Sequence, residues 1–161
     1  MISEFYKNRD KHYVAVDCII MGFQENELNI MIAKRPFEPM KGGWSLMGGF
    51  VNEFESVNEA AKRVVNEFTG IDDIYMEQVG AYGEVERDLE RVISIAYYAL
   101  VDFEKFDTSI ARKYDARWVK FSRLPELIFD HTLMVRDTLK LLQRRAAVKP
   151  IGFNLLGDQF T

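Results

Sequence analysis

The chain has 161 residues, 48% of them apolar and 29% charged, and this size and composition suit one globular domain with a sizeable core. A net charge of −4 argues against nucleic-acid binding by the chain itself. The sequence contains no apolar run near 18 residues, and no apolar signal core follows Lys7, Arg9 and Lys11. We therefore expect no membrane span and a cytoplasmic location. The single cysteine, Cys18, is expected to be a buried small hydrophobe.

Residues 13–23 and 28–33 are rich in β-branched and aromatic side chains and flank a polar turn, which predicts two paired strands. Asp17 shares a face of the first strand with apolar residues. It is either a structural carboxylate or an acceptor in a ligand pocket. Lys34 and Arg35 end the second strand, and a solvated strand end is one interpretation of Arg35.

Residues 44–46 form a short predicted strand that leads into the Gly48-Gly49 turn, and a helix follows. Ser56 and Glu59 have the spacing of a capping box, and Gly70 is expected to end the helix in the left-handed conformation. Two stripes run along this helix at steps of three and four residues. The apolar stripe is Val57, Ala60, Ala61, Val64, Val65 and Phe68, and the charged one is Glu59, Arg63 and Glu67.

The second half of the chain alternates strands and helices. Strands are predicted at 74–83, 92–101 and 114–121, with a short helix within 103–112, and the most apolar strand, 92–101, is expected to be central. The charged connector 82–91 is either a solvated loop or an active-site flap that carries Glu84 or Glu86.

A final helix is predicted to begin near Asp130, and His131 at its start is expected to be structural rather than a metal ligand, with no second histidine nearby. The expected core face of this helix is Leu133, Val135, Leu139, Leu141 and Leu142.

The glycine turn and its helix resemble the Nudix box, G-x5-E-x7-R-E-U-x-E-E-x-G-U, where U is aliphatic. The residues in register are Gly49, Glu55, Arg63, Val65, Glu67, Gly70 and Ile71, preceded by the Trp44-Ser45-Leu46-Met47-Gly48-Gly49 approach. This resemblance implies an α/β/α sandwich with a mixed sheet. It also implies a magnesium or manganese ion that is held by glutamates and activates water for attack on a diphosphate.

Two positions depart from that pattern, because Val64 and Phe68 stand where the family has glutamates. Neither side chain offers an oxygen ligand, so we expect no metal, no cofactor and no catalytic residues. If the chain is nevertheless a magnesium-dependent hydrolase of a nucleoside diphosphate derivative, Glu67 and Glu55 are the residues expected to carry the reaction. A third interpretation is a dimerisation scaffold with an empty pocket.

The chain also resembles the Nudix-related transcriptional regulators, and in particular the arabinose-responsive regulators of Bacteroidetes. The resemblance implies a sensor domain over residues 1–149, with residues 150–161 as an apolar tail toward an absent C-terminal winged helix-turn-helix domain. DNA would be bound only through that domain, and a homodimer is expected. The similar stretches are 17–20, 44–50, 94–100, 128–131 and 150–156.

The resemblance leaves the effector open between a sugar such as L-arabinose and an ADP-ribose-like nucleotide. A sugar would use carboxylates beside a ring, whereas a nucleotide would need cations, including Arg87, and an aromatic side chain. The complete predicted ligand-binding set is Asp17, Lys34, Arg35, Trp44, Gly49, Phe50, Glu67, Arg91, Asp130 and His131.

Overall fold

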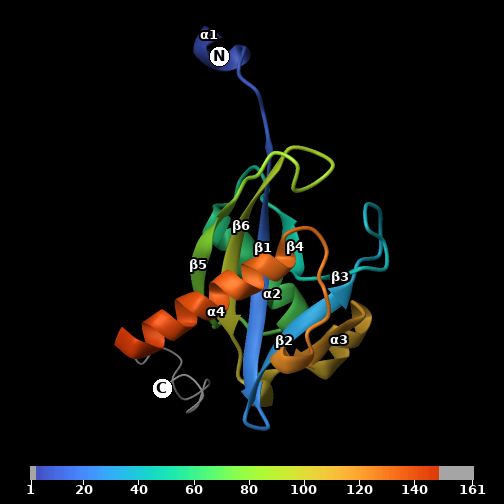
Figure 1. Cartoon of the computed structure of the whole chain (residues 1–161). Coiled ribbons are helices and arrows are strands. Elements are labelled where there is room, and N and C mark those ends of the chain that lie inside the picture. Colours follow the sequence, from blue (N-terminus) through green and yellow to red (C-terminus); the bar gives the residue numbers. More distant parts are fainter. Residues whose placement is uncertain (1–2, 149–161) are drawn as a thin grey trace.

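The computed structural model describes residues 3–148, which form a mixed sheet with helices on both faces (Figure 1). The strands are β1 (Tyr13–Gln24), β2 (Glu27–Lys34), β3 (Trp44–Ser45), β4 (Met47–Phe50), β5 (Tyr75–Tyr82), β6 (Val92–Leu100) and β7 (Ala116–Lys120). The helices are α1 (Glu4–Lys7), α2 (Val57–Thr69), α3 (Thr108–Lys113) and α4 (His131–Val148), with 3-10 turns at Phe103–Lys105 and Phe121–Arg123.

The sheet combines parallel and antiparallel pairs, as the sequence predicted. Its order is β3-β2-β1-β6-β5, and β4 and β7 pair in addition with β1 and β2. The neighbours β1 and β6 are parallel, whereas the other pairs are antiparallel. The apolar strand β6 therefore lies inside the sheet, which leaves β5 at an edge.

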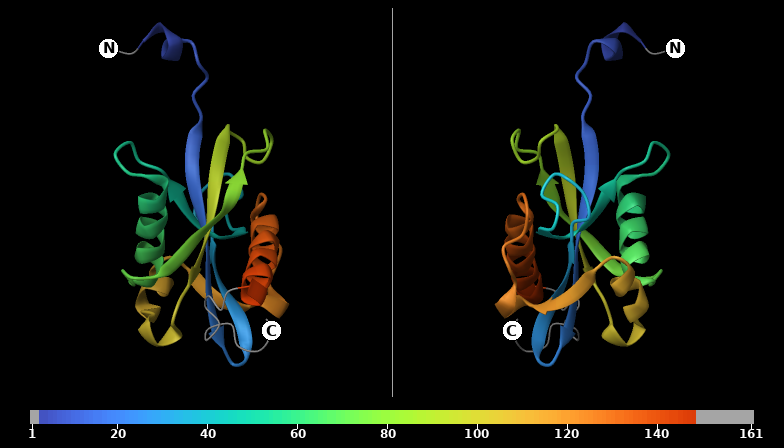
Figure 2. Two further views of the ribbon diagram at one scale, coloured as in Figure 1. Left: turned by 90° about the vertical axis from the view of Figure 1, so that its left-hand side faces the viewer. Right: turned by 90° about the vertical axis from the view of Figure 1, so that its right-hand side faces the viewer.

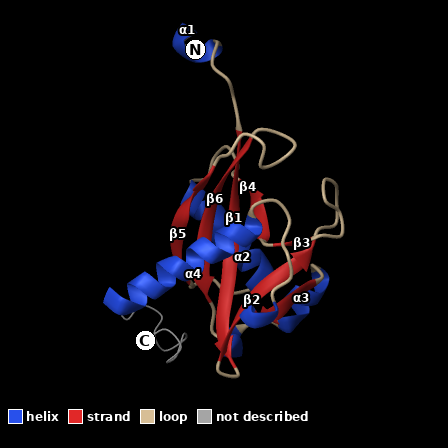
Figure 3. Cartoon of the chain, viewed as in Figure 1, coloured by secondary structure: helices blue, strands red, loops and turns tan. Residues whose placement is uncertain are grey.

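Two helices cover the sheet, α2 on one face and α4 on the other (Figures 2 and 3). Alternate residues of β1 supply the two cores. Cys18 and Ile20 belong to the cluster that packs on α2, whereas Ile19 and Met21 belong to the cluster that packs on α4. This arrangement confirms the predicted α/β/α sandwich. The predicted tail, 150–161, lies outside the described residues.

Helix α2 begins and ends where the sequence predicted. The Ser56 hydroxyl accepts a hydrogen bond from the Glu59 amide at 3.1 Å, and the Glu59 carboxylate accepts one from the Ser56 amide at 2.6 Å. Gly70 follows with a φ of 72°, a left-handed conformation that glycine adopts without a steric cost, and its amide donates to the Asn66 carbonyl. The cap and the glycine thus fix the length of the helix.

Ser56→Ala is expected to lower the free energy of unfolding by about 1 kcal/mol, because an amide of the first turn loses its acceptor. Urea unfolding followed by circular dichroism measures this loss. Ser56→Thr keeps the capping oxygen and is the control, so an equal loss in both variants would contradict the role of the cap.

Helix α4 corrects one prediction. Its buried face comprises His131, Met134, Val135, Thr138, Leu139 and Leu142, whereas Leu133 is 49% exposed and was wrongly assigned to the core. The buried face starts at His131 and continues at steps of three and four residues, and Leu133 falls outside this series. Leu141 is partly buried and packs at the edge of the core. In the described part of the chain, no helix is long and apolar enough to cross a membrane.

Cys18 is fully buried, as predicted, and its thiol faces the Ala61 carbonyl oxygen at 3.8 Å. Burial, and then the nearby Asp17 carboxylate, raise the pKa of the Cys18 thiol far above its usual range. The folded protein is therefore expected not to react with Ellman's reagent at pH 8, and to release one equivalent of thionitrobenzoate in guanidinium chloride. Rapid reaction of the folded protein would contradict this burial.

Candidate functional site

Gly48 and Gly49 were predicted to form a turn, but they lie within strand β4, which brings Asp17 against the start of the Nudix-like motif. Strand β4 pairs antiparallel with β1, so that Asp17 lies opposite Gly48. A Cβ atom on Gly48 would lie 2.6 Å from the Asp17 Oδ1 atom and 2.8 Å from the Val16 carbonyl oxygen. Glycine is thus required here for two strands to approach each other around a carboxylate.

Asp17 belongs to a buried polar network on the α4 side of the sheet. Its side chain accepts a hydrogen bond from the Ser94 hydroxyl at 2.5 Å, and the Nε2 atom of His131 lies 3.4 Å from its other oxygen. His131 Nδ1 accepts a hydrogen bond from the Leu46 amide at 3.1 Å. The Nδ1 atom is therefore unprotonated and the ring proton is on Nε2, toward Asp17. This supports the predicted structural role of His131.

Arg87 connects this network to the start of α4. Its Nε and Nη2 atoms donate to the two carboxylate oxygens of Asp130 at 2.9 and 2.8 Å, and Nη2 lies 3.9 Å from Asp17. Only 4% of the Arg87 side chain is exposed. Burial favours the neutral guanidine, but the hydrogen bonds and charge of Asp130, together with the charges of Asp17 and Asp88, outweigh it and raise the pKa of Arg87. Arg87 thus fixes the loop of residues 83–91 to the domain through a buried ion pair.

The rest of that loop lines an open pocket of about 780 Å³ beside the ion pair. Three acids, Glu84, Glu86 and Asp130, line it together with one cation, Arg87. Of the predicted ligand-binding set, only Asp130 lines this pocket. The remaining lining residues are Ala81, Tyr82, Gly83, Val85, Phe129 and Leu133.

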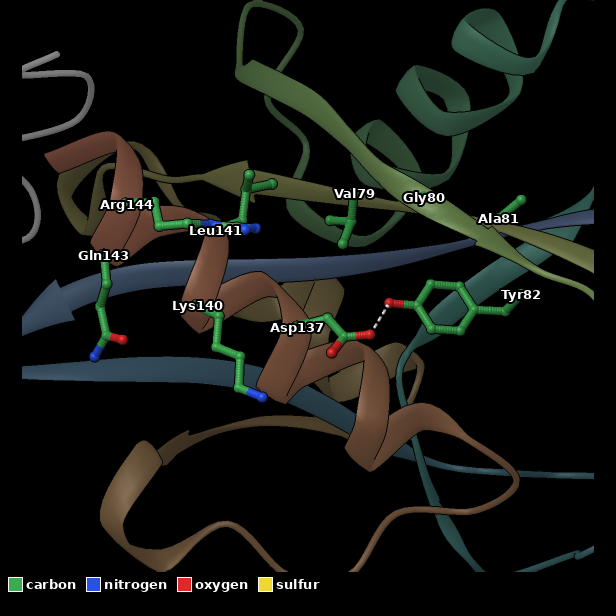
Figure 4. Close-up of a pocket in the computed structure, with 9 residues that line it drawn as sticks. All are labelled: Val79, Gly80, Ala81, Tyr82, Asp137, Lys140, Leu141, Gln143 and Arg144. Atoms are coloured by element: carbon green, nitrogen blue, oxygen red, sulfur yellow. Dashed lines mark hydrogen bonds between the residues drawn. The ribbon is translucent and has the colours of Figure 1, made fainter. Parts of the chain in front are cut away.

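A second groove of about 900 Å³ runs between β5 and α4 (Figure 4). Tyr82 lines both hollows, and its hydroxyl donates a hydrogen bond to Asp137 at 2.7 Å. Burial, and then this carboxylate, raise the pKa of Tyr82. The tyrosine therefore stays a neutral hydrogen-bond donor, and it connects the two sides of the groove.

On the α2 side, Arg63 holds the turn before the helix in place. It donates two hydrogen bonds to Glu55, at 3.1 and 2.8 Å, and one to the Phe50 carbonyl at 2.9 Å. Glu67 lies 3.5 Å from the same guanidinium. The hydrogen bonds from Arg63, and then from the Asn52 amide, lower the pKa of Glu55. Both glutamates retained from the motif are therefore paired with one arginine.

The residues at this helix do not fit the metal ion that the motif implies. Val64 is fully buried, and the Phe68 ring packs 4.5 Å from that of Tyr114. Neither side chain has an oxygen for a hard cation. Within residues 3–148, no three or more histidine, cysteine, aspartate or glutamate side chains lie close enough together to hold a metal ion.

A cluster of cations and aromatic rings lies at the end of β2. The Trp44 ring has Lys34 Nζ at 5.3 Å and the Arg117 guanidinium at 4.6 Å. The Arg35 guanidinium lies 4.5 Å from the Phe37 ring and 5.3 Å from that of Phe129, and its buried Nε atom has no hydrogen-bond partner. The structure thus brings the predicted Lys34, Arg35 and Trp44 together. Since Phe129 also lines the loop pocket, the cluster adjoins it.

The predicted ligand-binding residues do not form one site. Asp17, Asp130 and His131 gather on the α4 side, whereas Gly49, Phe50 and Glu67 lie beside α2, where the Phe50 ring packs 5.7 Å from that of Tyr13. Arg91 donates to the Gly83 carbonyl within its own loop. Sequence reasoning left Arg117 out and counted Arg87 only among the cations for a nucleotide. No local pattern marks either one, because their partners are distant in sequence.

The fold and the site together define an α/β/α sandwich in which the glycine-containing strand β4 leads into the capped helix α2. The chain belongs to the NUDIX domain family, whose profile matches residues 11–146. It is 28% identical over 153 residues to the ADPR responsive transcriptional repressor NtrR of Acinetobacter baylyi, a match that covers 92% of this chain and 61% of the repressor.

Two further relatives differ in activity. The ADP-ribose pyrophosphatase of Methanocaldococcus jannaschii is 34% identical over 128 residues, which cover 79% of this chain and 73% of the enzyme. The crystal structure of Shewanella oneidensis NrtR complexed with a 27mer DNA superimposes with a TM-score of 0.76 at 27% identity, over 83% of this chain and 63% of that one. The chain thus spans under two thirds of the length of these regulators.

Proposed function

We propose that this chain is the effector-binding domain of a Nudix-related transcriptional regulator, and that it binds a small molecule without hydrolysing it. The observation that carries this proposal is the replacement of two motif glutamates by the buried Val64 and by Phe68. The two remaining glutamates are paired with Arg63. The similarity to a transcriptional repressor that is ADPR responsive supports a sensing role.

We further propose a sugar such as L-arabinose as the effector, bound in the pocket beside the 83–91 loop. Carboxylates accept hydrogen bonds from sugar hydroxyls, and this pocket has Glu84, Glu86 and Asp130. Its one cation, Arg87, is already paired with Asp130. This excess of negative charge opposes a diphosphate. An ADP-ribose-like effector would instead use the cluster of Arg35, Lys34 and Trp44.

A thermal-shift panel of pentoses, ADP-ribose and NAD, each with and without magnesium, tests the effector. A ligand at one hundred times its Kd adds about 2.7 kcal/mol to the free energy of unfolding. We expect L-arabinose to raise Tm without magnesium. Glu86→Gln, which changes a pocket residue, should reduce the shift, whereas Glu90→Gln, the same change elsewhere in the loop, should not. A shift with ADP-ribose alone, lost in Arg35→Ala, would identify the nucleotide, and no shift with any ligand would leave only a scaffold.

The alternative function is a magnesium-dependent Nudix hydrolase, favoured by the 34% identity to an ADP-ribose pyrophosphatase and by the retained Glu55 and Glu67. It requires magnesium-dependent release of AMP from ADP-ribose. We expect no turnover above a blank. Saturable hydrolysis that Glu67→Gln abolishes would overturn the sensor proposal.

The complete regulator is proposed to act in the cytoplasm as a homodimer and to bind DNA through a C-terminal domain outside this chain. Two features support DNA binding through a further domain. The chain covers 63% of the NrtR chain that was solved with DNA. Its own charge is negative, which opposes contact with phosphates. Binding of operator DNA by the complete protein, but not by this chain, is the expected result in a mobility-shift assay.

A further inference from the structure

The N-terminal arm, residues 3–12, stands clear of the folded body (Figure 1). All ten of its residues are exposed. The arm consists of the four-residue helix α1 and an extended stem. Lys7 pairs with Glu4 at 2.7 Å and Arg9 lies over the Phe5 ring at 4.7 Å, so these side chains interact within the arm. The backbone joins the body at Tyr13, whose amide donates to the Arg91 carbonyl.

This arm has the properties of a segment that packs on another molecule. A helix of four residues is far below the length that is stable alone in water. It nevertheless carries Phe5 and Tyr6, which are 66% and 64% exposed. Covering these rings would remove apolar surface from water, which is favourable. The arm therefore gains most of its stability when a surface covers these two rings.

The 83–91 loop offers a surface with complementary chemistry. Val85 and Leu89 are 70% and 80% exposed on it. The loop contains four acids and two arginines, whereas the arm contains three cations and two acids. The loop is thus net negative and the arm net positive. Their basic and acidic side chains are Lys7, Arg9 and Lys11 on the arm, and Glu84, Glu86, Asp88 and Glu90 on the loop.

We propose that the arm of one copy packs over the 83–91 loop of a second copy, with Phe5 and Tyr6 against Val85 and Leu89. The stem leads α1 away from its own domain in all views, which presents the arm to another molecule (Figures 1 and 2). A two-fold dimer makes the exchange reciprocal, so that each arm covers the partner's loop. This inference rests on the homodimer of the proposed function and names its interface.

The exchange also brings the partner to the effector pocket. The 83–91 loop supplies Glu84, Val85 and Glu86 to the pocket lining. An arm packed on Val85 therefore lies at the border of this pocket. Dimerisation and effector binding would then act on the same loop, which Arg87 holds to the domain.

Light scattering of the chain of residues 1–161 after size-exclusion chromatography tests the interface. The double variant Phe5→Glu, Tyr6→Glu is expected to stay folded, since no residue of the arm is buried, and to raise the dimer Kd at least tenfold. Phe121→Glu changes an aromatic residue that is 39% exposed outside the arm and the loop, and should leave the Kd unchanged. If the double variant dimerises with an unchanged Kd, the proposed role of the arm is wrong, but the proposed homodimer still stands. A wild-type monomer at all concentrations overturns the proposed homodimer as well, whereas the thermal-shift panel tests effector binding separately.

Disulfide trapping then distinguishes an arm that packs on the loop of a second copy from an arm that packs on the loop of its own chain. Two chains of different size, one with Tyr6→Cys and the other with Leu89→Cys, are mixed and oxidised mildly. The native Cys18 is fully buried and does not compete. A disulfide between the two chains is the expected result. If a single chain that carries both substitutions forms only an internal disulfide, and the mixture forms none, the arm packs on its own loop and the exchange is wrong.

Discussion

Arg87→Ala is expected to lower the free energy of unfolding by about 3–5 kcal/mol, because it leaves the carboxylates of Asp17 and Asp130 without their cation. The Arg87 side chain is only 4% exposed, so its removal takes a hydrogen-bonded cation out of the folded interior. The 83–91 loop should also detach from α4, which would remove one wall of the pocket. Urea unfolding at pH 7 measures the first effect, and hydrogen exchange of the loop amides measures the second.

Two variants make this result specific. Arg91→Ala removes a partly exposed arginine from the same loop, which donates to the Gly83 carbonyl, and should cost less than about 1 kcal/mol. Arg87→Lys keeps the positive charge but loses the pair of parallel hydrogen bonds to Asp130. Its loss in the free energy of unfolding should lie between those of Arg87→Ala and Arg91→Ala. Equal losses in Arg87→Ala and Arg91→Ala would show that the buried ion pair contributes nothing particular to stability.

Sequence patterns predicted the parts of this protein that local chemistry determines. The Ser56–Glu59 box and Gly70 gave the limits of α2, and the alternation in β1 correctly placed Cys18 on one face and Asp17 on the other. Such features depend on neighbours within a few residues, or on a two-residue period. The predicted mixed sheet followed from the same patterns together with the family resemblance.

The contacts that build the site could not be predicted in this way. Arg87 pairs with an aspartate 43 residues away, and the Leu46 amide bonds to a histidine 85 residues away. The connector around Arg87 is rich in charge, and this composition is compatible with a solvated loop as well as with an active-site flap. The error at Leu133 has a different origin, because Leu133 falls outside the series of three- and four-residue steps that begins at His131.

Val64→Glu restores the first missing glutamate of the motif, and it is expected to destabilise the protein by about 4 kcal/mol at pH 9, above the raised pKa of the buried carboxyl. Val64 is fully buried, and a Cβ atom on Gly49 would lie only 3.2 Å from its Cγ2 atom. A carboxylate placed there loses its hydration, and burial without a partner raises the pKa of a glutamate by about three units. The added charge therefore opposes folding instead of preparing a metal site.

The pH dependence identifies this cause. A carboxyl whose pKa is raised in the folded state destabilises the protein fully above that pKa, and the loss shrinks as pH falls toward the unfolded value near 4.3. Val64→Gln introduces a side chain of the same size as glutamate but without a charge. Its loss in the free energy of unfolding should therefore not depend on pH in this way. Magnesium should not rescue Val64→Glu, because Glu55 and Glu67 are paired with Arg63 and Phe68 still offers no oxygen. A magnesium-dependent rise in Tm for Val64→Glu, absent from the wild type, would mean that the helix retains the geometry of a metal centre, and it would contradict this prediction.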